Sequence, residues 1–295
     1  MNDKKKEYLA DLSLVLMAAI WGSGFIFTKQ ALESYGSFQV LFIRFLIASL
    51  TLLIININKL KLLNKDTLKT GGFIGMFLFF GFIFQTLGLE NSPAGKSAFL
   101  TSSYVAFVPL ITLLITKQKP DKYNVFAAIL MIVGMFLLMI DLKSGFYIES
   151  YDVLTLIGAV FWGLHVASVG IFSKKHDPML LVMFQMMMAC LLSGIAMILA
   201  GETSVEIQKN TLFGLMYLGI FCSAITFAIQ NVAQKFTNST RASIIMSLES
   251  VFGTIFGILF LNEHFTFQMI LGFIVIFIAL IMAETKFSFL RKEKV

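Results

Sequence analysis

The chain has 295 residues, of which 58% are hydrophobic and only 14% are charged, and its mean hydropathy is +0.85. A soluble domain carries about 25% charged residues, so this composition excludes a water-soluble globule with a polar surface. The net charge of +6 does not indicate nucleic-acid binding, because the basic residues gather between apolar segments. A transmembrane β-barrel is excluded as well, since its strands would alternate polar and apolar residues.

Ten apolar segments follow one another, each of about 20 residues and therefore long enough to cross a hydrocarbon core of about 30 Å. We expect transmembrane helices over residues 9–28, 38–57, 70–89, 97–116, 122–141, 153–172, 179–200, 211–231, 241–261 and 267–285. The connections are too short for an extramembrane domain. The first segment follows three lysines, as in a signal peptide, but it lacks a small-x-small cleavage site, so we expect it to be retained.

The basic residues predict how the helices are oriented. With the N-terminus in the cytoplasm, eighteen Lys and Arg residues fall on the cytoplasmic side and four fall on the other side, namely Lys29, Lys96, Lys143 and Lys209. Because cytoplasmic loops are rich in basic residues, this asymmetry predicts ten helices with both termini in the cytoplasm. The tails would then be residues 1–8 and the basic residues 286–295, in a protein of the inner or plasma membrane.

Cysteines and histidines indicate neither a metal site nor a catalytic centre. Cys190 and Cys222 are single cysteines inside apolar segments, which is typical of small core residues. The three histidines are scattered, and no CxxC, HExxH, P-loop or GxSxG pattern occurs. We therefore expect no metal, no cofactor and no catalytic residue.

The two halves of the chain repeat each other. An offset of 141 residues aligns Asp11 with Asp152, Trp21–Gly22 with Trp162–Gly163, and Arg44 with Gln185. An offset of 145 aligns Gln85 with Gln230, Lys96 with Arg241, Ser102 with Ser247, and Phe107 with Phe252. The extra four residues fit a longer connection between the seventh and eighth helices than between the second and third.

Each repeat, residues 9–141 and 153–285, contains five predicted helices. An odd number means that the second repeat crosses the membrane in the opposite direction to the first. Inverted repeats can pack in two related ways around a site near the middle of the membrane, which favours transport. The sequence thus predicts an all-α integral membrane protein with two inverted five-helix repeats.

Four segments carry a resemblance to a known family. They are AAIWGSGFIFTKQAL, FIRFLIASLTLL, SPAGKSAFLTSSYVAFVPLITLLI and AQKFTNSTRASIIMSLESVFGTIFGILFLNEHFT. In this order they resemble the EamA family of the drug/metabolite transporter superfamily. The resemblance implies two five-helix EamA repeats and transport, often export, of small metabolites such as amino acids. The family commonly has a Glu-Pro pair where this chain has Glu249–Ser250, so the ninth helix lacks its usual proline.

Polar and aromatic side chains inside the predicted helices are the candidates for a substrate cavity. A carboxylate in the middle of a membrane helix costs about 2.5–3.5 kcal/mol on insertion scales, so we expect Glu249 to face a polar cavity. It lies away from a stripe of small residues that suits close helix packing. The candidate residues are Trp21, Arg44, Gln85, Tyr104, Trp162, His165, Gln185, Gln230, Asn231 and Glu249.

Three of these candidates are ionisable and lie at similar depths. At 1.5 Å per residue, Arg44 lies about 10 Å from the outer side, His165 about 18 Å from it, and Glu249 about 12 Å from the inner side. An Arg44–Glu249 pair is therefore within reach, and a Glu249–His165 contact would permit proton coupling. Structural roles stay open as well: Arg44 can snorkel, and the other polar groups can bond one helix to another.

Together these features predict a transporter that binds a small organic metabolite and the lipid bilayer, but no nucleic acid. We expect export by alternating access around a cavity near the midplane. A channel or facilitator is the first alternative, and it would not show counterflow exchange. An integral-membrane enzyme would need paired acids or a metal cluster, and a scaffold would not need intramembrane Arg, Glu and His.

Overall fold

The computed structural model describes residues 3–139, 149–204, 208–261 and 267–285, and within these ranges all regular structure is helical. The α-helices are α1 (Asp3–Leu32), α2 (Ser37–Ile55), α3 (Lys65–Glu90), α4 (Ala94–Ser102), α5 (Tyr104–Thr116), α6 (Lys122–Met139), α7 (Ser150–Phe172), α8 (Pro178–Leu199), α9 (Lys209–Gly219), α10 (Thr226–Ala233), α11 (Ser239–Met246), α12 (Glu249–Leu261) and α13 (Phe267–Thr285). A 3₁₀-helix, η1 (Ile57–Leu62), follows α2, and a π-helix, η2 (Ile220–Ile225), joins α9 to α10.

The helices agree with the all-α membrane fold predicted from the sequence. Within the described ranges, eight helical segments are long and apolar enough to cross a membrane, while Lys122–Leu137 and Ile270–Ala283 are apolar but shorter. Some boundaries differ from the prediction: α1 begins at Asp3 rather than at residue 9, and α3 begins at Lys65 rather than at residue 70. A helix can extend beyond the hydrocarbon because its backbone bonds are internal and its lysines reach water. The predicted C-terminal tail, 286–295, and residues 140–141 lie outside the described ranges.

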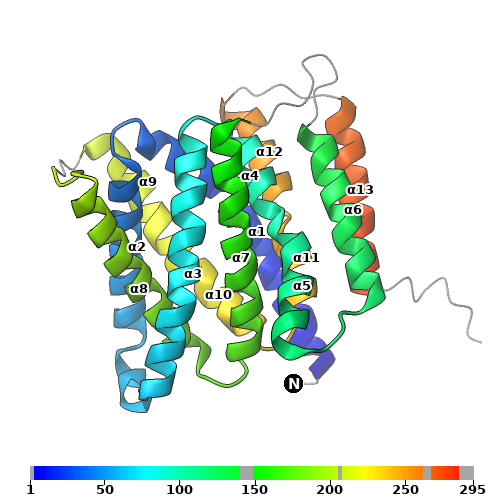
Figure 1. Ribbon diagram of the computed structural model, residues 1–295, viewed down its shortest axis with the longest axis horizontal. Coiled ribbons are helices and arrows are strands. Elements are labelled where there is room, and N and C mark those ends of the chain that lie inside the picture. The colour runs from blue at the N-terminus through cyan, green and yellow to red at the C-terminus, as the bar shows by residue number, and fades with distance from the viewer. Residues whose placement is uncertain (1–2, 140–148, 205–207, 262–266, 286–295) are drawn as a thin grey trace, which may run out of the picture.

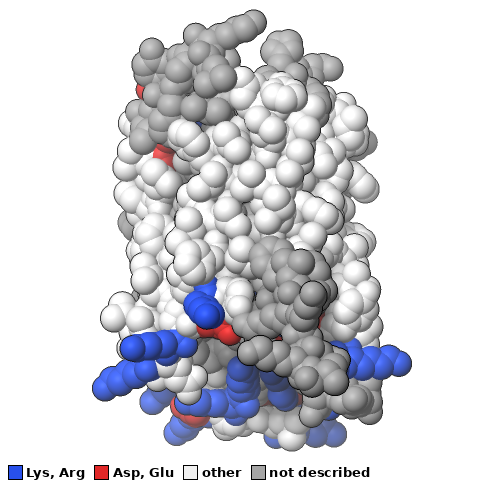
Figure 2. Space-filling view, turned by 90° about the vertical axis from the view of Figure 1, so that its right-hand side faces the viewer, with Lys and Arg blue, Asp and Glu red and all other residues white. Residues whose placement is uncertain are grey.

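The helices form one bundle with an apolar middle and one strongly basic end. In Figure 1, α2 and α8 pack together at the left edge, and α6 and α13 pack together at the right edge. Figure 2 shows an uncharged band across the middle of one face and a concentration of Lys and Arg at the lower end. We call this the basic end; it is where α1 begins at Asp3 and α3 begins at Lys65.

Two of the predicted helices are interrupted, and the interruptions are equivalent. The predicted fourth helix is divided at Ser103 into α4 and α5, and the predicted ninth is divided at 247–248 into α11 and α12. Tighter bonds between residues three apart mark both places, for example from the N–H of Ser103 to Leu100 O and from that of Leu248 to Ile245 O. The ninth helix is therefore interrupted even though it lacks the proline that is usual in the family.

The eighth predicted helix contains the π-helix η2, whereas its counterpart α3 is uninterrupted. Before η2, Gly219 takes the place of Gly75, an offset of 144, since each glycine packs on equivalent residues of the other half. After η2, Gln230 corresponds to Gln85, an offset of 145. The wide turn thus accommodates one residue that the first repeat lacks, and the connection before α9 contains the other three.

Contacts between the halves recur with the halves exchanged. α2 and α8 run in opposite directions, because Lys59 after α2 pairs with Asp177 before α8, and Glu202 after α8 accepts from the N–H of Gln39 at the start of α2. The other exchanged contacts are the ion pairs Arg241–Asp11 and Lys96–Asp152, the approach of Gly22 to Phe252 and of Gly163 to Phe107, and that of Gly75 to Gln185 and of Gly219 to Arg44. An approximate twofold relation between the two halves of the chain accounts for these pairs.

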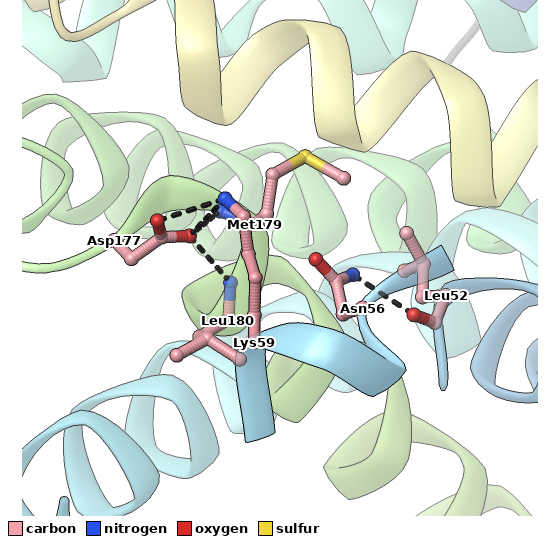
Figure 3. A network of polar contacts seen from close by, with 6 residues as sticks. All are labelled: Leu52, Asn56, Lys59, Asp177, Met179 and Leu180. Carbon is pink, nitrogen blue, oxygen red and sulfur yellow. Dashed lines mark hydrogen bonds and ion pairs between the residues drawn. The ribbon is translucent and has the colours of Figure 1, made fainter. Parts of the chain in front are cut away.

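A polar network fastens α2 to α8 at the basic end (Figure 3). The Asp177 carboxylate accepts hydrogen bonds from the N–H groups of Met179 and Leu180 at the start of α8 and from Lys59 Nζ. Nearby, Asn56 Nδ2 donates to Leu52 O and closes the end of α2. Burial opposes ionisation of Asp177, but the hydrogen bonds and the charge of Lys59 outweigh it, so the pKa of Asp177 lies below its ordinary 3.8.

Close packing of α1 on α12 gives a first prediction. An alanine at position 22 would bring its Cβ within 2.6 Å of Phe252 Cβ and 2.8 Å of the backbone N of Gly253. Because backbone cannot move aside easily, we expect Gly22→Ala to destabilise the protein by about 1–3 kcal/mol. Gly214→Ala is the matched control, since its Cβ would meet Phe27 at an ordinary 3.4 Å. Thermal denaturation in detergent measures both, and equal melting temperatures would contradict the proposed packing.

The cap of α8 gives a second prediction. We expect Asp177→Ala to lower the free energy of unfolding by about 1 kcal/mol at pH 7, as loss of a helix N-cap usually does. Asp177→Asn keeps an acceptor and loses only an exposed ion pair, so its effect should be smaller. Because the folded pKa is lowered, the charge stabilises the fold above pH 3.8 and this contribution is lost as the pH falls further. Thermal denaturation in detergent across this pH range checks the sign; a difference that grows on acidification would refute it.

Candidate functional site

Four aromatic rings meet between the two repeats. The ring centroids of Trp21 and Trp162 are 5.7 Å apart, and each tryptophan packs on a phenylalanine: Trp21 on Phe227 at 5.0 Å and Trp162 on Phe82 at 4.8 Å. Phe82 and Phe227 correspond under the offset of 145, so the exchange of the two halves maps the cluster onto itself. We call these four residues the aromatic plug.

A narrow cavity of about 440 Å³, including its mouth, lies on one side of the aromatic plug. Thr28 and Leu89 are in the last turns of α1 and α3, so the cavity extends toward the end of the bundle opposite the basic end. Its walls combine a cation, an acid and an amide with aromatic rings. The lining residues are Trp21, Gly24, Phe25, Thr28, Arg44, Phe82, Gln85, Thr86, Leu89, Trp162 and Glu249.

Arg44 is held on one side only. Its Nε donates to Ser223 Oγ at 2.6 Å, its Nη2 donates to Cys222 O at 3.1 Å, and its guanidinium lies 4.2 Å from the centre of the Phe82 ring. Both acceptors belong to η2. Trp21 Nε1 also donates to Cys222 O, at 3.1 Å, and to Thr226 Oγ1, at 3.0 Å. The π-helix therefore positions both a cation and an aromatic wall of the cavity.

Glu249 lies where the two interrupted helices meet. It is the first residue of α12, and Ser102, the last residue of α4, donates to its Oε1 at 3.1 Å. Carboxylates are favourable at helix N-termini, where backbone N–H groups are unpaired. The Glu249 side chain is 3% exposed and lines the cavity. Tyr104, its counterpart in the other repeat, is buried beside it, but the Tyr104 hydroxyl does not reach hydrogen-bond geometry.

Four of the remaining predicted residues do not line the cavity, namely His165, Gln185, Gln230 and Asn231. His165 Nε2 contacts Gln185 Oε1 at 3.0 Å, and Gln185 Nε2 donates to Asn231 Oδ1 at 2.9 Å. Gln230 Nε2 donates to Gln234 Oε1, which lies one turn further along the chain. Gln85, in contrast, lines the cavity and donates to Thr101 Oγ1 at 3.0 Å.

The sequence depths suggested contacts that this structure does not contain. Among the described residues, no hydrogen bond or ion pair joins Glu249 to Arg44 or to His165. The Arg44 side chain turns toward η2, and His165 packs on the Trp162 and Phe227 rings of the aromatic plug. The predicted residues therefore divide into a cavity group and a packed group.

The packed group is the counterpart of the cavity lining under the two offsets. Applied to Gly24, Phe25, Thr28, Arg44, Phe82, Gln85, Thr86 and Leu89, the offsets give His165, Val166, Val169, Gln185, Phe227, Gln230, Asn231 and Gln234. Each of these eight residues is 0% exposed. The residues equivalent to the cavity lining are therefore all present in the other repeat, but there they are packed together and none of them is exposed.

Sequence reasoning missed several cavity residues and all of η2. Thr86 and Phe82 line the cavity but are an ordinary threonine and one of 32 phenylalanines. Their equivalence to Asn231 and Phe227 was a signal that could have found them. Ser223 and Cys222 had no such signal, because the widened turn that presents them depends on three-dimensional packing. Among the described residues, no cluster of His, Cys, Asp or Glu is suited to a metal ion.

Comparison with known proteins places the chain in a family. The sequence profile of the EamA-like transporter family matches residues 8–140 and again residues 149–285. The chain belongs to the EamA-like transporter family. Membership and the apolar helices indicate a multi-pass membrane transporter rather than an enzyme.

Relatives in the same family cover nearly the whole chain. An uncharacterized transporter of Archaeoglobus fulgidus is 34% identical over 281 residues, 95% of this chain and 87% of the relative. The uncharacterized transporter YoaV of Bacillus subtilis is 24% identical over 94% of this chain and 97% of its own. A WAT1-related chloroplastic protein of Arabidopsis thaliana is 23% identical over 90% of this chain and 66% of its own. One crystal structure superposes with a TM-score of 0.77 at 14% identity, over 98% of this chain and 99% of that chain, which supports the fold alone.

Proposed function

We propose that this protein exports small organic metabolites, amino acids and related solutes among them, across the inner or plasma membrane by alternating access. The single observation that carries the proposal is the pairing of a cavity on one side of the aromatic plug with a closed, equivalent set of residues on the other. Inverted repeats supply two related packings, so the exchange of their conformations would close the first cavity and open the second.

Alternating access explains the polar atoms of the closed side. His165 Nδ1 and Gln230 Oε1 are buried without a hydrogen-bond partner. Unsatisfied polar atoms are costly inside a membrane protein and call for an explanation. Residues that line a water-filled cavity in a second conformation would find their partners there. The aromatic plug also favours a transporter over a channel, because its four rings pack against one another between the two repeats.

The proposed topology has ten helices, with α6 and α13 crossing the membrane in addition to the eight longer segments. The repeats are residues 9–141 and 153–285, with tails 1–8 and 286–295. The basic end faces the cytoplasm, in keeping with the concentration of Lys and Arg there (Figure 2). The cavity then opens to the outside, and its closed counterpart faces the cytoplasm. Export is the direction that resemblance to the family suggests.

Single cysteines test the two sides. In a protein whose Cys190 and Cys222 are replaced by alanine, we expect Thr86→Cys to react with a membrane-impermeant maleimide from outside only. Its counterpart Asn231→Cys should react only from the cytoplasmic face, during excursions to the second conformation. Labelling of right-side-out and inside-out vesicles measures both.

Control positions make the outcome interpretable. Glu90→Cys and Lys119→Cys report the outer and cytoplasmic surfaces, and Ala167→Cys is buried like Asn231 but is the counterpart of Ile26, which does not line the cavity. Ala167→Cys should stay unreactive. Labelling of Asn231→Cys from outside, or of Glu90→Cys from the cytoplasm, would reject the proposed arrangement.

Substitution of Glu249 tests whether the carboxylate in the cavity takes part in transport. Glu249→Gln keeps an oxygen that can accept from Ser102 and removes the titratable charge, so we expect normal insertion and folding. If the carboxylate takes part in coupling, transport should fall by about tenfold or more, which corresponds to about 1.4 kcal/mol, or should lose its pH dependence. Proteoliposome uptake of a solute found by metabolite profiling measures this. Ser102→Ala is the control that removes the hydrogen bond alone; full, pH-sensitive transport by Glu249→Gln would exclude Glu249 from the mechanism.

A further inference from the structure

Arg44 is a buried cation whose direct partners are all uncharged, although Glu249 lines the same cavity. Its side chain is 5% exposed and lines the cavity, and its partners are a hydroxyl, a backbone carbonyl and an aromatic ring. No carboxylate of the described residues lies within ion-pair distance of it. Because an unpaired charge is expensive to bury in a membrane protein, such a residue normally marks a site where an anion or water completes its shell.

The contacts of Arg44 fix the guanidinium and leave part of it unused. Ser223 takes the Nε–H and Cys222 O takes one Nη2–H, and the Phe82 ring covers one face. The two N–H groups of Nη1 and the second one of Nη2 have no partner in the described chain. A guanidinium presents its donors in a rigid planar fork that matches the two oxygens of a carboxylate. η2 therefore fixes the Arg44 guanidinium while three of its five N–H donors stay unused.

A second unused donor comes from the way the repeats differ. Trp21 Nε1 is satisfied by Cys222 O and Thr226 Oγ1, but its counterpart Trp162 Nε1 has no hydrogen-bond partner. The counterpart of Thr226 is Gly81, which has no side chain and lies against the Trp162 ring, and α3 has no π-turn to present a carbonyl. Trp162 also lines the cavity and packs on the same Phe82 ring as Arg44, although its Nε1 atom is itself buried in this conformation.

We propose that Arg44 and Trp162 Nε1 bind a carboxylate group of the transported solute, and that the apolar part of the solute lies against the aromatic plug. This inference rests on the proposed transport function and names the substrate class of its cavity: organic carboxylates with an apolar body. Arg44 and Trp162 set the specificity, and Ser223 and the Cys222 carbonyl act as positioning groups.

The chemistry of the cavity favours a carboxylate over a phosphate. The unused donors belong to one guanidinium and one indole, no lysine or second arginine lines the cavity, and Glu249 adds an acid to its wall. A phosphate is strongly hydrated and carries up to two charges, so these donors would leave it poorly compensated. A carboxylate needs only one positive charge and few donors, and the rings of Trp21, Phe82 and Trp162 suit an apolar substituent.

Binding of matched probes tests the proposal without knowledge of the natural solute. Purified protein in nanodiscs is titrated with 3-phenylpropionate and with 3-phenylpropionamide, which have the same shape but differ in charge. We expect millimolar 3-phenylpropionate to raise the melting temperature and the amide to have no effect. An equal response to both compounds, or no response to the carboxylate, overturns the proposal.

Variants assign the effect to the two donors. Arg44→Gln should weaken carboxylate binding by about tenfold or more, because a charge-assisted hydrogen bond usually contributes at least that much. Arg44→Lys keeps the positive charge but loses the planar pair of donors, so its affinity for the carboxylate should lie between that of the native protein and that of Arg44→Gln. Trp162→Phe keeps the aromatic wall, removes only Nε1–H and should weaken the carboxylate severalfold. Lys119→Gln, at an exposed loop position, removes an equal charge and should leave binding unchanged. Carboxylate affinity that survives both Arg44→Gln and Trp162→Phe overturns the proposal.

Failure of this inference differs from failure of the transport function. Vesicles that exchange solutes, none of which carries a carboxylate, would refute the carboxylate site while transport stands. Vesicles that bind 3-phenylpropionate in an Arg44-dependent manner but exchange no solute would refute transport while the binding site stands.

Discussion

Inside a bilayer a polar group has no water to bond with, so each one must find its partner within the protein. This constraint shapes the whole bundle. Ser243, Ser250 and Thr254 donate their hydroxyl protons to backbone carbonyls three or four residues earlier in the chain, which makes the buried face of α11 and α12 effectively apolar. Exceptions remain among the buried polar atoms of the described residues, and they include Trp162 Nε1 at the cavity and His165 Nδ1 and Gln230 Oε1 among its counterparts.

The twofold relation helps to interpret these unpaired atoms, because each residue can be compared with its counterpart in the other repeat. Trp21 Nε1 donates a hydrogen bond to the Thr226 hydroxyl, whereas Trp162 Nε1 has no partner. Gly81, the counterpart of Thr226, has no hydroxyl to offer. The residue added in η2 makes the two repeats chemically different, because the widened turn presents the carbonyl and the hydroxyl that hold Arg44. Its counterpart Gln185 is instead bound to His165 and Asn231, in a neutral network. A nearly symmetric fold thus has a charged side and a neutral side.

How far the sequence predicts this structure depends on the range of the interaction concerned. Long apolar runs gave the helix positions within a few residues, because a helix is satisfied by its own backbone. The offsets of 141 and 145 found the twofold partners, because equivalent positions keep similar residues. The interruption at Leu248 was not predictable without its proline, and the turn of Arg44 toward η2, away from Glu249, depends on packing between α2 and α9 that no local pattern encodes.

The charge difference between the two sides has a consequence for the proposed cycle. If the cavity closed while empty, Arg44 would lose its water without gaining a counter-charge, and that desolvation is unfavourable by several kcal/mol. A bound carboxylate removes this penalty, so the loaded protein closes more readily than the empty one. The neutral network around Gln185 imposes no comparable penalty on its own side. A ligand shifts a conformational equilibrium only through such differential stabilisation, and here a single unpaired guanidinium provides it. In the proposed cycle, coupling between binding and closure would follow from the guanidinium that the widened turn η2 holds.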